Sequence, residues 1–206
     1  MSNPFSSRRV RPGAIPFLFP PGLGAAELVA RLAQLGWRAS IVGPHGSGKS
    51  TLLAALRPEI ERMGCGVESI ALRDRQRRLP AEFLEAIVRR TPTIAIIDGY
   101  EQLGYRSRWQ LCRRCRATGA GLLITTHRRT SLPVLFQTAT DFELFQRIVE
   151  HLVATGDDMV EQAAPIALLD LRRVWQRHGG NLRESLFDLY DLFEHRRIGA
   201  MVAFGF

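Results

Sequence analysis

The sequence predicts an α/β fold in which a parallel sheet is flanked by helices. Along residues 37–137, short apolar runs alternate with segments whose apolar residues recur at helical spacing, which is the order of elements that a parallel sheet requires. The run Thr93–Asp98 is apolar almost without interruption, as expected of a strand covered on both faces. With 206 residues, of which 46% are hydrophobic, the chain is long enough to bury such a core.

Three domains are expected along the chain. Residues 1–22 carry five prolines and little periodicity, which predicts an extended N-terminal arm. Residues 23–140 hold the alternating pattern of the α/β core, and residues 141–206 are expected to form a small helical lid with an apolar C-terminal tail. That tail, from residue 198 onward, is too short to span a membrane, and we expect it to dock on the body or to bind a partner.

Within the core, each element follows from its local pattern. Predicted strands cover 37–42, 67–72, 93–98, 121–128 and 134–137. Predicted helices run from Gly24 to Gly36, from Lys49 to Met63 with an interruption considered at Pro58, from Pro80 to the Thr91-Pro92 stop, and from a Ser107 cap through Cys115 to Gly119. Strands that alternate with helices in this way predict right-handed crossovers between parallel strands.

After Asp141 the pattern becomes helical. Helices are predicted over 142–153 and 165–178, followed by a third helix with Asn181 as its N-cap and Glu184 at the capping-box position. The apolar face expected for this third helix consists of Leu186, Phe187, Leu189, Tyr190 and Phe193.

A phosphate-binding loop is predicted between the first strand and the first core helix. The segment 43–50 fits Gly-x-x-x-x-Gly-Lys-[Ser/Thr], and its glycines let successive backbone N–H groups point at an anion while the following helix adds its positive N-terminal end. The predicted nucleotide-binding residues are Gly43, Pro44, His45, Gly46, Ser47, Gly48, Lys49, Ser50 and Thr51.

The composition of the cationic residues supports this interpretation. The chain has 27 arginines and a single lysine, and that lysine is Lys49 of the loop. A compact ammonium fits a phosphate loop in a way that a planar guanidinium does not. Lys49 is expected to reach the outer phosphates, while the Ser50 hydroxyl is expected to ligate Mg²⁺.

An acid stands at the end of the most apolar strand. Asp98 closes the run that begins at Thr93, and the carboxyl ends of parallel strands lie at the edge of the sheet where the loop after the first strand also lies. Asp98 is therefore predicted to hold the Mg²⁺ shell together with Ser50.

Taken together, these segments resemble the P-loop NTPases with an additional strand between the two Walker strands, and more closely the AAA+ ATPases. In that family the Walker B strand usually ends in adjacent Asp and Glu, whereas here Gly99 follows Asp98 and the nearest acid is Glu101. The resemblance implies a catalytic base, for which Glu101 is the first candidate and Asp74 the second, or else slow turnover.

Two further segments carry the resemblance. The segment 124–128 is similar to the sensor 1 region, with His127 where an Asn is common, and also to the switch histidine of transporter ATPases. The segment 180–183 resembles the sensor 2 motif, which implies that Arg183 reaches the nucleotide. A surface histidine and an ordinary capped helix remain the alternatives. With Lys49 as the only lysine, the Asn-Lys-x-Asp motif of GTPases is absent.

The net charge indicates which partners the chain favours, and the cysteines indicate whether disulfides or a metal site are expected. A net charge of +8 favours polyanions, although the arginine pairs are scattered and aromatic residues are not interleaved with them in a pattern typical of single-strand or RNA binding. Three cysteines imply no disulfide framework, and the C-x-x-C spacing of Cys112 and Cys115 indicates one face of a buried helix rather than a metal site.

The predicted function is that of a Mg²⁺-dependent ATPase whose nucleotide state changes the conformation of the lid and acts on a DNA or protein partner. No apolar run is long enough for a membrane span, and the use of ATP predicts a cytoplasmic location. Two alternatives stay open: a small-molecule or nucleoside kinase, and an ATP-gated scaffold without hydrolysis. Oligomerisation of the chain is compatible with each of these functions.

Overall fold

The computed structural model describes residues 3–73, 76–89, 92–155 and 167–203, with side chains up to residue 198. The chain divides into two compact units. The first consists of Met1–Leu18, Pro44–Thr51 and Ala139–Phe206, and the second of Phe19–Gly43 and Leu52–Thr138. The boundaries predicted from the sequence, after residues 22 and 140, remain a prediction.

The second unit is built on a five-stranded sheet in which every strand pair is parallel. Its strands, in chain order, are β1 (Arg38–Val42), β2 (Gly66–Ala71), β3 (Thr93–Asp98), β4 (Gly121–Thr126) and β5 (Val134–Gln137). Their spatial order is β2-β3-β4-β1-β5, so β4 lies between the strand that precedes the loop and the strand that ends at Asp98. The predicted parallel sheet, including its additional strand, is confirmed.

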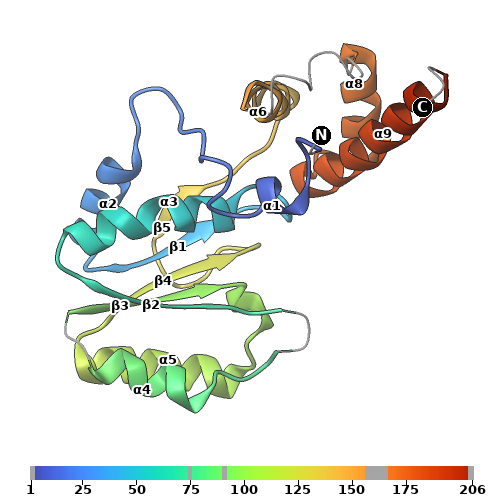
Figure 1. The fold of residues 1–206 in the computed structure, drawn as a ribbon. Coiled ribbons are helices and arrows are strands. Elements are labelled where there is room, and N and C mark those ends of the chain that lie inside the picture. The colour runs from blue at the N-terminus through green and yellow to red at the C-terminus, as the bar shows by residue number, and fades with distance from the viewer. Residues whose placement is uncertain (1–2, 74–75, 90–91, 156–166, 204–206) are drawn as a thin grey trace. The chain divides into compact units, whose positions relative to one another are not determined.

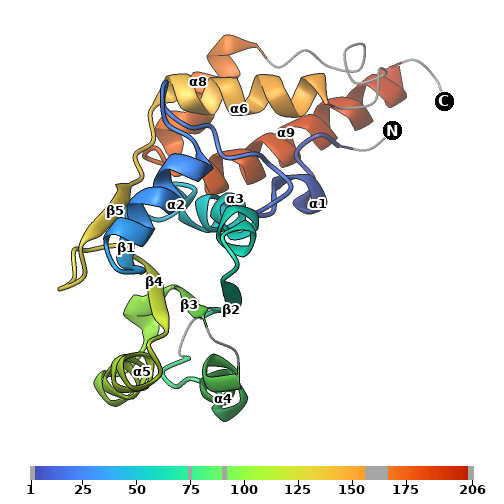
Figure 2. The same cartoon turned by 90° about the vertical axis from the view of Figure 1, so that its left-hand side faces the viewer.

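Helices flank both faces of this sheet. Helices α4 (Ala81–Arg89) and α5 (Tyr105–Thr118) lie side by side on one face, as Figures 1 and 2 show, while α2 (Ala25–Gln34) and α3 (Lys49–Arg62) cover the other. Burial explains the arrangement, because the middle strands β3 and β4 are buried along almost their whole length. A parallel strand with apolar side chains on both faces needs a helix layer on each side.

The core beneath α4 and α5 is formed by interlocking aliphatic and aromatic side chains. Its fully buried members include Ile87 of α4, Leu111 of α5 and Ile97 of β3. Burying each such side chain contributes roughly 1.5–3 kcal/mol. This layer therefore fixes the end of β3, and with it the start of the segment that follows Asp98.

The first unit gathers the C-terminal helices around a core of its own. These helices are α6 (Phe142–Ala154), α8 (Leu168–Arg177) and α9 (Leu182–Ala203), and Phe145 of α6 stacks on Trp175 of α8 with ring centroids 5.2 Å apart. The N-terminal segment, which contains the one-turn helix α1 (Ser7–Val10), belongs to the same core. Phe5 is fully buried in it.

Some local predictions differ from the structure. Helix α5 begins at Tyr105 with Gly104 as its N-cap, so the predicted Ser107 cap is wrong, and Ser107 is instead a buried residue within the helix. Helix α3 continues through Pro58 to Arg62. On α9, Phe187 and Tyr190 are exposed, whereas the other three residues of the predicted apolar face are buried.

Candidate functional site

The end of β3 places an acid at the carboxyl edge of the sheet. Asp98 is the last residue of the strand, and Gly99 then adopts a left-handed conformation with φ 83° and ψ 40°. A Cβ at Gly99 would lie 3.1 Å from the carbonyl oxygen of Leu72, so a larger residue would be crowded as well as strained. The left-handed Gly99 is therefore what turns the chain after Asp98.

A threonine hydroxyl ties this turn to the neighbouring strand. Oγ1 of Thr125, a fully buried residue of β4, donates to Oδ1 of Asp98 at 2.5 Å and accepts from the backbone N–H of Gly99 at 2.8 Å. The hydroxyl can serve as donor and acceptor at once. Thr125 therefore fixes both the rotamer of the carboxylate and the start of the turn.

The turn carries Glu101 to His127. Glu101 lies in the short 3-10 helix η1 (Tyr100–Gln102), and its Oε1 is 2.8 Å from Nε2 of His127. Nδ1 of His127 is 3.1 Å from the carbonyl oxygen of Gly43, the first residue of the loop motif. A carbonyl only accepts, so Nδ1 is the donor in this contact, and the ring bridges Gly43 and Glu101.

The second carboxylate oxygen of Glu101 is left without a partner. Oε2 is shielded from solvent and accepts no hydrogen bond from the described residues. A buried carboxylate oxygen without a donor is costly, so a water or ligand is expected at this position. The backbone is held in place, since Arg108 donates to the carbonyl of Glu101 at 2.9 Å and lies over the Tyr100 ring. The carboxylate is thus oriented, with one buried oxygen left without a donor among the described residues.

The predicted phosphate loop has the backbone that its glycines suggest. Gly46 and Gly48 have φ of 67° and 84°, and helix α3 begins directly afterwards at Lys49. The buried ammonium of Lys49 donates to the carbonyl of Pro44 at 2.6 Å, and Oγ of Ser47 donates to the same carbonyl at 2.8 Å. The side chain of the only lysine is therefore folded back over the loop, and its ammonium lies beside the loop backbone that we expect to bind phosphate.

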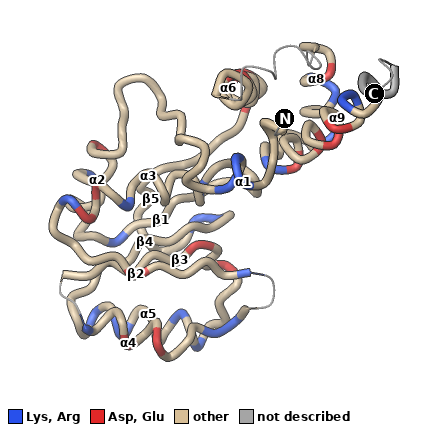
Figure 3. Tube along the Cα trace, in the orientation of Figure 1, with Lys and Arg blue, Asp and Glu red and all other residues tan. Residues whose placement is uncertain are grey.

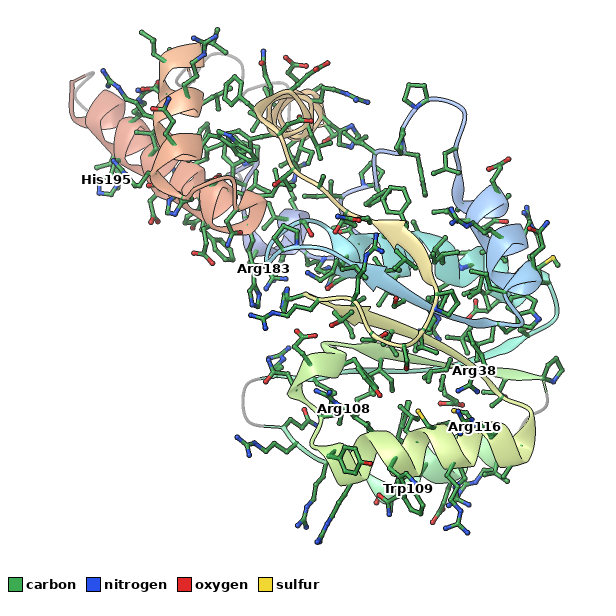
Figure 4. The ribbon with its side chains drawn as sticks, turned by 180° about the vertical axis from the view of Figure 1, so that it is seen from behind. Arg38, Arg108, Trp109, Arg116, Arg183 and His195 are labelled. Carbon is green, nitrogen blue, oxygen red and sulfur yellow. The ribbon has the colours of Figure 1, made fainter. Side chains whose placement is uncertain are left out.

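Within the same unit, the start of α9 lies against the apex of this loop. A Cβ at Gly46 would overlap the side chain of Asn181 and would lie 3.3 Å from the backbone nitrogen of Arg183. Asn181 is the N-cap predicted from the sequence, because its Oδ1 accepts from the N–H groups of Arg183 and Glu184. The side chain of Arg183 is exposed (Figure 4).

The structure therefore brings the predicted site residues together in two groups, one in each unit. Lys49, Asn181 and Arg183 belong to the loop group, and Asp98, Glu101 and His127 to the group at the sheet edge. Sequence reasoning missed the role of Thr125 as the hydrogen-bond partner of Asp98. The signal was available, since a polar residue within a fully buried strand needs a partner. The alternative base Asp74 lies outside the described residues.

The cysteines of helix α5 form neither a disulfide nor a metal site among the described residues. Cys115 is fully buried in the core of its unit, Cys112 is half-buried on the same helix, and both are free thiols. Among the described residues, no group of three or more His, Cys, Asp or Glu side chains could hold a metal ion. Mg²⁺ does not require such a cage, because it is commonly bound by one or two protein oxygens together with phosphates and water.

No protein-family model matches the chain, and no curated protein matches it. Among solved structures, the chain is similar to that of C. elegans PCH-2, with 13% identity and a TM-score of 0.43. The match covers 84% of this chain and 66% of that one, just under two thirds of its length. No described helix is long and apolar enough to cross a membrane.

Proposed function

We propose that this chain binds Mg²⁺-ATP at the loop of residues 43–51 and hydrolyses it to ADP and phosphate. The observation that carries the proposal is the carboxylate of Glu101, which is oriented by His127 through one oxygen while the other is buried and unpartnered. A general base has to be held within reach of the proton that it accepts. The residue stands three positions after Asp98, close in sequence to the predicted Mg²⁺ ligand.

The donors present fit the proposed nucleotide. Two glycines with positive φ, a helix N-terminus and a buried lysine form a cradle for phosphate oxygens. For the metal, the chain offers the Ser50 hydroxyl and the Asp98 carboxylate, which are the oxygen ligands that Mg²⁺ prefers. Bound Mg²⁺ supplies neutralisation of the charge that develops on the phosphate oxygens.

In this proposal each site residue has a definite role. Lys49 binds the outer phosphates, and Asp98, with its rotamer fixed by Thr125, orients the Mg²⁺ shell. Oε2 of Glu101 accepts a proton from the attacking water, while His127 keeps the carboxylate in place. Arg183 lies in the first turn of α9, whose cap Asn181 touches the loop, and we assign Arg183 to the nucleotide.

The proposed output is a conformational change in the helices that follow residue 141. Asn181 caps α9 and also lies against Gly46, so a ligand that moves the loop acts directly on the start of that helix. A DNA or protein partner, with or without oligomerisation of the chain, would sense the change. The use of ATP fits a cytoplasmic location.

The Lys49→Ala variant tests the nucleotide site. We expect it to lose ATP binding in a fluorescence or calorimetric titration, whereas Arg57→Ala, which removes one positive charge from an exposed position on the same helix, should bind ATP normally. Equal ATP affinity of Lys49→Ala and the wild type would contradict the phosphate loop.

Product analysis tests the reaction. We expect inorganic phosphate to be released from ATP without any added acceptor, and the rate is to be measured with and without duplex DNA. Transfer of phosphate only to an added small-molecule acceptor would replace the ATPase proposal with a kinase. Tight ATP binding without turnover under every condition would identify a nucleotide-gated scaffold.

A further inference from the structure

The outer face of helix α5 is strongly basic. Its 14 residues include five arginines and no acid, in a chain whose charged residues otherwise mix both signs. Figure 3 shows blue segments along the layer formed by α4 and α5, with red segments among them. The arginines are Arg106, Arg108, Arg113, Arg114 and Arg116. A one-sign helix of this kind attracts a polyanion.

Two aromatic rings lie on the same helix and are exposed. Tyr105 is 84% exposed and Trp109 is 54% exposed. The two residues are four positions apart, so they lie next to each other on one face of the helix. The guanidinium of Arg113, one turn further along, lies 5.3 Å from the centre of the Trp109 ring. Figure 4 shows Trp109 on the side of α5 that is turned away from the sheet. Ring, ring and guanidinium thus form one line along the helix.

On this helix aromatic residues and arginines do alternate, although the sequence shows no pattern typical of single-strand or RNA binding. In the sequence, Tyr105, Trp109 and Arg113 look scattered, but helical geometry places them on one stripe. Trp109, Arg113 and Arg116 also line a surface pocket of about 380 Å³, which Cys112 and Ala117 complete.

Most arginines of this helix are not used in ion pairs or side-chain hydrogen bonds among the described residues. Among the described residues, Arg106, Arg113, Arg114 and Arg116 form no ion pair, whereas the fifth, Arg108, is turned inward to the Glu101 carbonyl. The adjacent helix α4 does carry acids, Glu82 and Glu85, and Glu85 pairs with Arg89 of its own helix. The four outward arginines are therefore available for a partner.

We propose that the outer face of α5 binds single-stranded nucleic acid, with bases stacked on Tyr105 and Trp109 and phosphates paired with Arg113 and Arg116. Exposed rings beside arginines are the combination by which proteins hold single strands without reading sequence. A duplex hides the faces of its bases, so it offers phosphates but nothing to stack on these rings. An acidic protein surface would likewise use the arginines alone. The inference goes beyond the proposed ATPase activity and does not depend on it.

Binding of a labelled oligothymidylate, followed by fluorescence anisotropy, tests the proposal in the full-length protein. Trp109→Ala should weaken binding roughly 5- to 150-fold, since one base stacked on an aromatic ring contributes about 1–3 kcal/mol. Trp109→Phe keeps a ring and should bind nearly as the wild type does. The oligonucleotide should also quench intrinsic tryptophan fluorescence in the wild type but not in Trp109→Phe, although Trp37 and Trp175 remain.

A charge-matched pair of variants tests the arginines. Arg113→Glu/Arg116→Glu and the control Arg147→Glu/Arg173→Glu, at exposed positions on α6 and α8, each change the net charge from +8 to about +4. The α5 variant should lose affinity, and its log–log salt slope should fall by about 1.4, because each phosphate contact contributes about 0.7 for single strands. Equal losses in both variants would show that net charge alone causes binding, and would overturn the proposal.

Two further probes separate the alternative partners. A duplex that binds as tightly as the single strand, or polyglutamate that competes for the face at equal charge concentration, would overturn the assignment to single strands. Lys49→Ala should bind the oligonucleotide as the wild type does, even though it is expected to lose ATP. Failure of the nucleotide site and failure of the α5 face are therefore distinguished in the same set of proteins.

Discussion

Nε2 of His127 lies 2.8 Å from Oε1 of Glu101, so a residue just beyond β4 holds a carboxylate just beyond β3. Because the other ring nitrogen of His127 lies 3.1 Å from the carbonyl of Gly43, the imidazole is fixed at both ends. Gly99 separates Asp98 from this carboxylate, and its left-handed conformation turns the chain between them. His127 thus anchors the Glu101 carboxylate, which we propose as the catalytic base.

Glu101→Gln should bind ATP with unchanged affinity and hydrolyse it about 10²- to 10⁴-fold more slowly, because the amide has the shape of the carboxylate but accepts no proton. The rate of phosphate release and the dissociation constant for ATP are to be measured on the same protein. Glu82→Gln, which makes the same chemical change at an exposed position of α4, is the matched control and should be fully active. Wild-type hydrolysis by Glu101→Gln would remove the residue from the mechanism.

His127→Ala should lower kcat about tenfold or more while the KM for ATP changes little, because it leaves Glu101 without its orienting partner. His127→Gln retains an N–H that can reach Oε1, so part of the rate should return. A merely structural histidine would not produce this rescue, since both variants would then lower thermal stability and activity together. If KM rises and kcat is unchanged, His127 contacts the nucleotide and does not position Glu101.

The sheet was predictable because strands covered on both faces must be apolar. The run Thr93–Asp98 is β3 to the residue, and the acid at its end follows from the same pattern. Residues 134–137 were also assigned correctly as a strand. The loop and the Asn181 cap depend on local chemistry alone, with glycines where φ is positive and an amide where N–H groups need an acceptor, so a single sequence reveals both.

The position of Glu101 was not predictable in the same way. It depends on the left-handed conformation of Gly99 and on the pairing of β3 with β4, which brings Thr125 and His127 alongside. These contacts join residues 26 or 27 positions apart, and no local pattern encodes them. The start of helix α5 was predicted wrongly because its N-cap is Gly104, a residue with no side-chain acceptor that could indicate a cap in the sequence.

The stability of the fold should fall at alkaline pH, in part through Cys115. Burial raises the pKa of this thiol from its ordinary 9.0 to about 11, against a smaller lowering by Arg38. The folded state holds the proton more tightly than the unfolded state, so the contribution is complete below pH 9 and is lost as pH rises towards 11. In full, the raised pKa of Cys115 contributes about 2–3 kcal/mol to the free energy of unfolding.

Urea unfolding of the wild type and of Cys115→Ala at pH 7.5 and pH 10.5 measures this contribution. The wild type should lose more unfolding free energy between the two pH values than the variant does. Some loss should remain in the variant, because burial also raises the pKa of Tyr100 to about 12. Equal pH dependence of the two proteins would show that Cys115 ionises as freely in the folded state as in the unfolded one.

Asn181 combines two roles that substitution can separate. Its Oδ1 caps α9, and its side chain lies against Gly46 at the apex of the phosphate loop. Asn181→Ala should lower the free energy of unfolding by about 1 kcal/mol, a fall of roughly 2–4 °C in Tm, because the cap is lost.

Asn181→Asp keeps the cap and should retain the wild-type Tm. Its carboxylate, however, would face the phosphates, so the affinity for ATP should fall about tenfold or more at low salt. ATP affinity in Asn181→Asp equal to that of the wild type would mean that the bound phosphates lie away from this side chain. The contact between Gly46 and the start of α9 could then not transmit the nucleotide state to the helices.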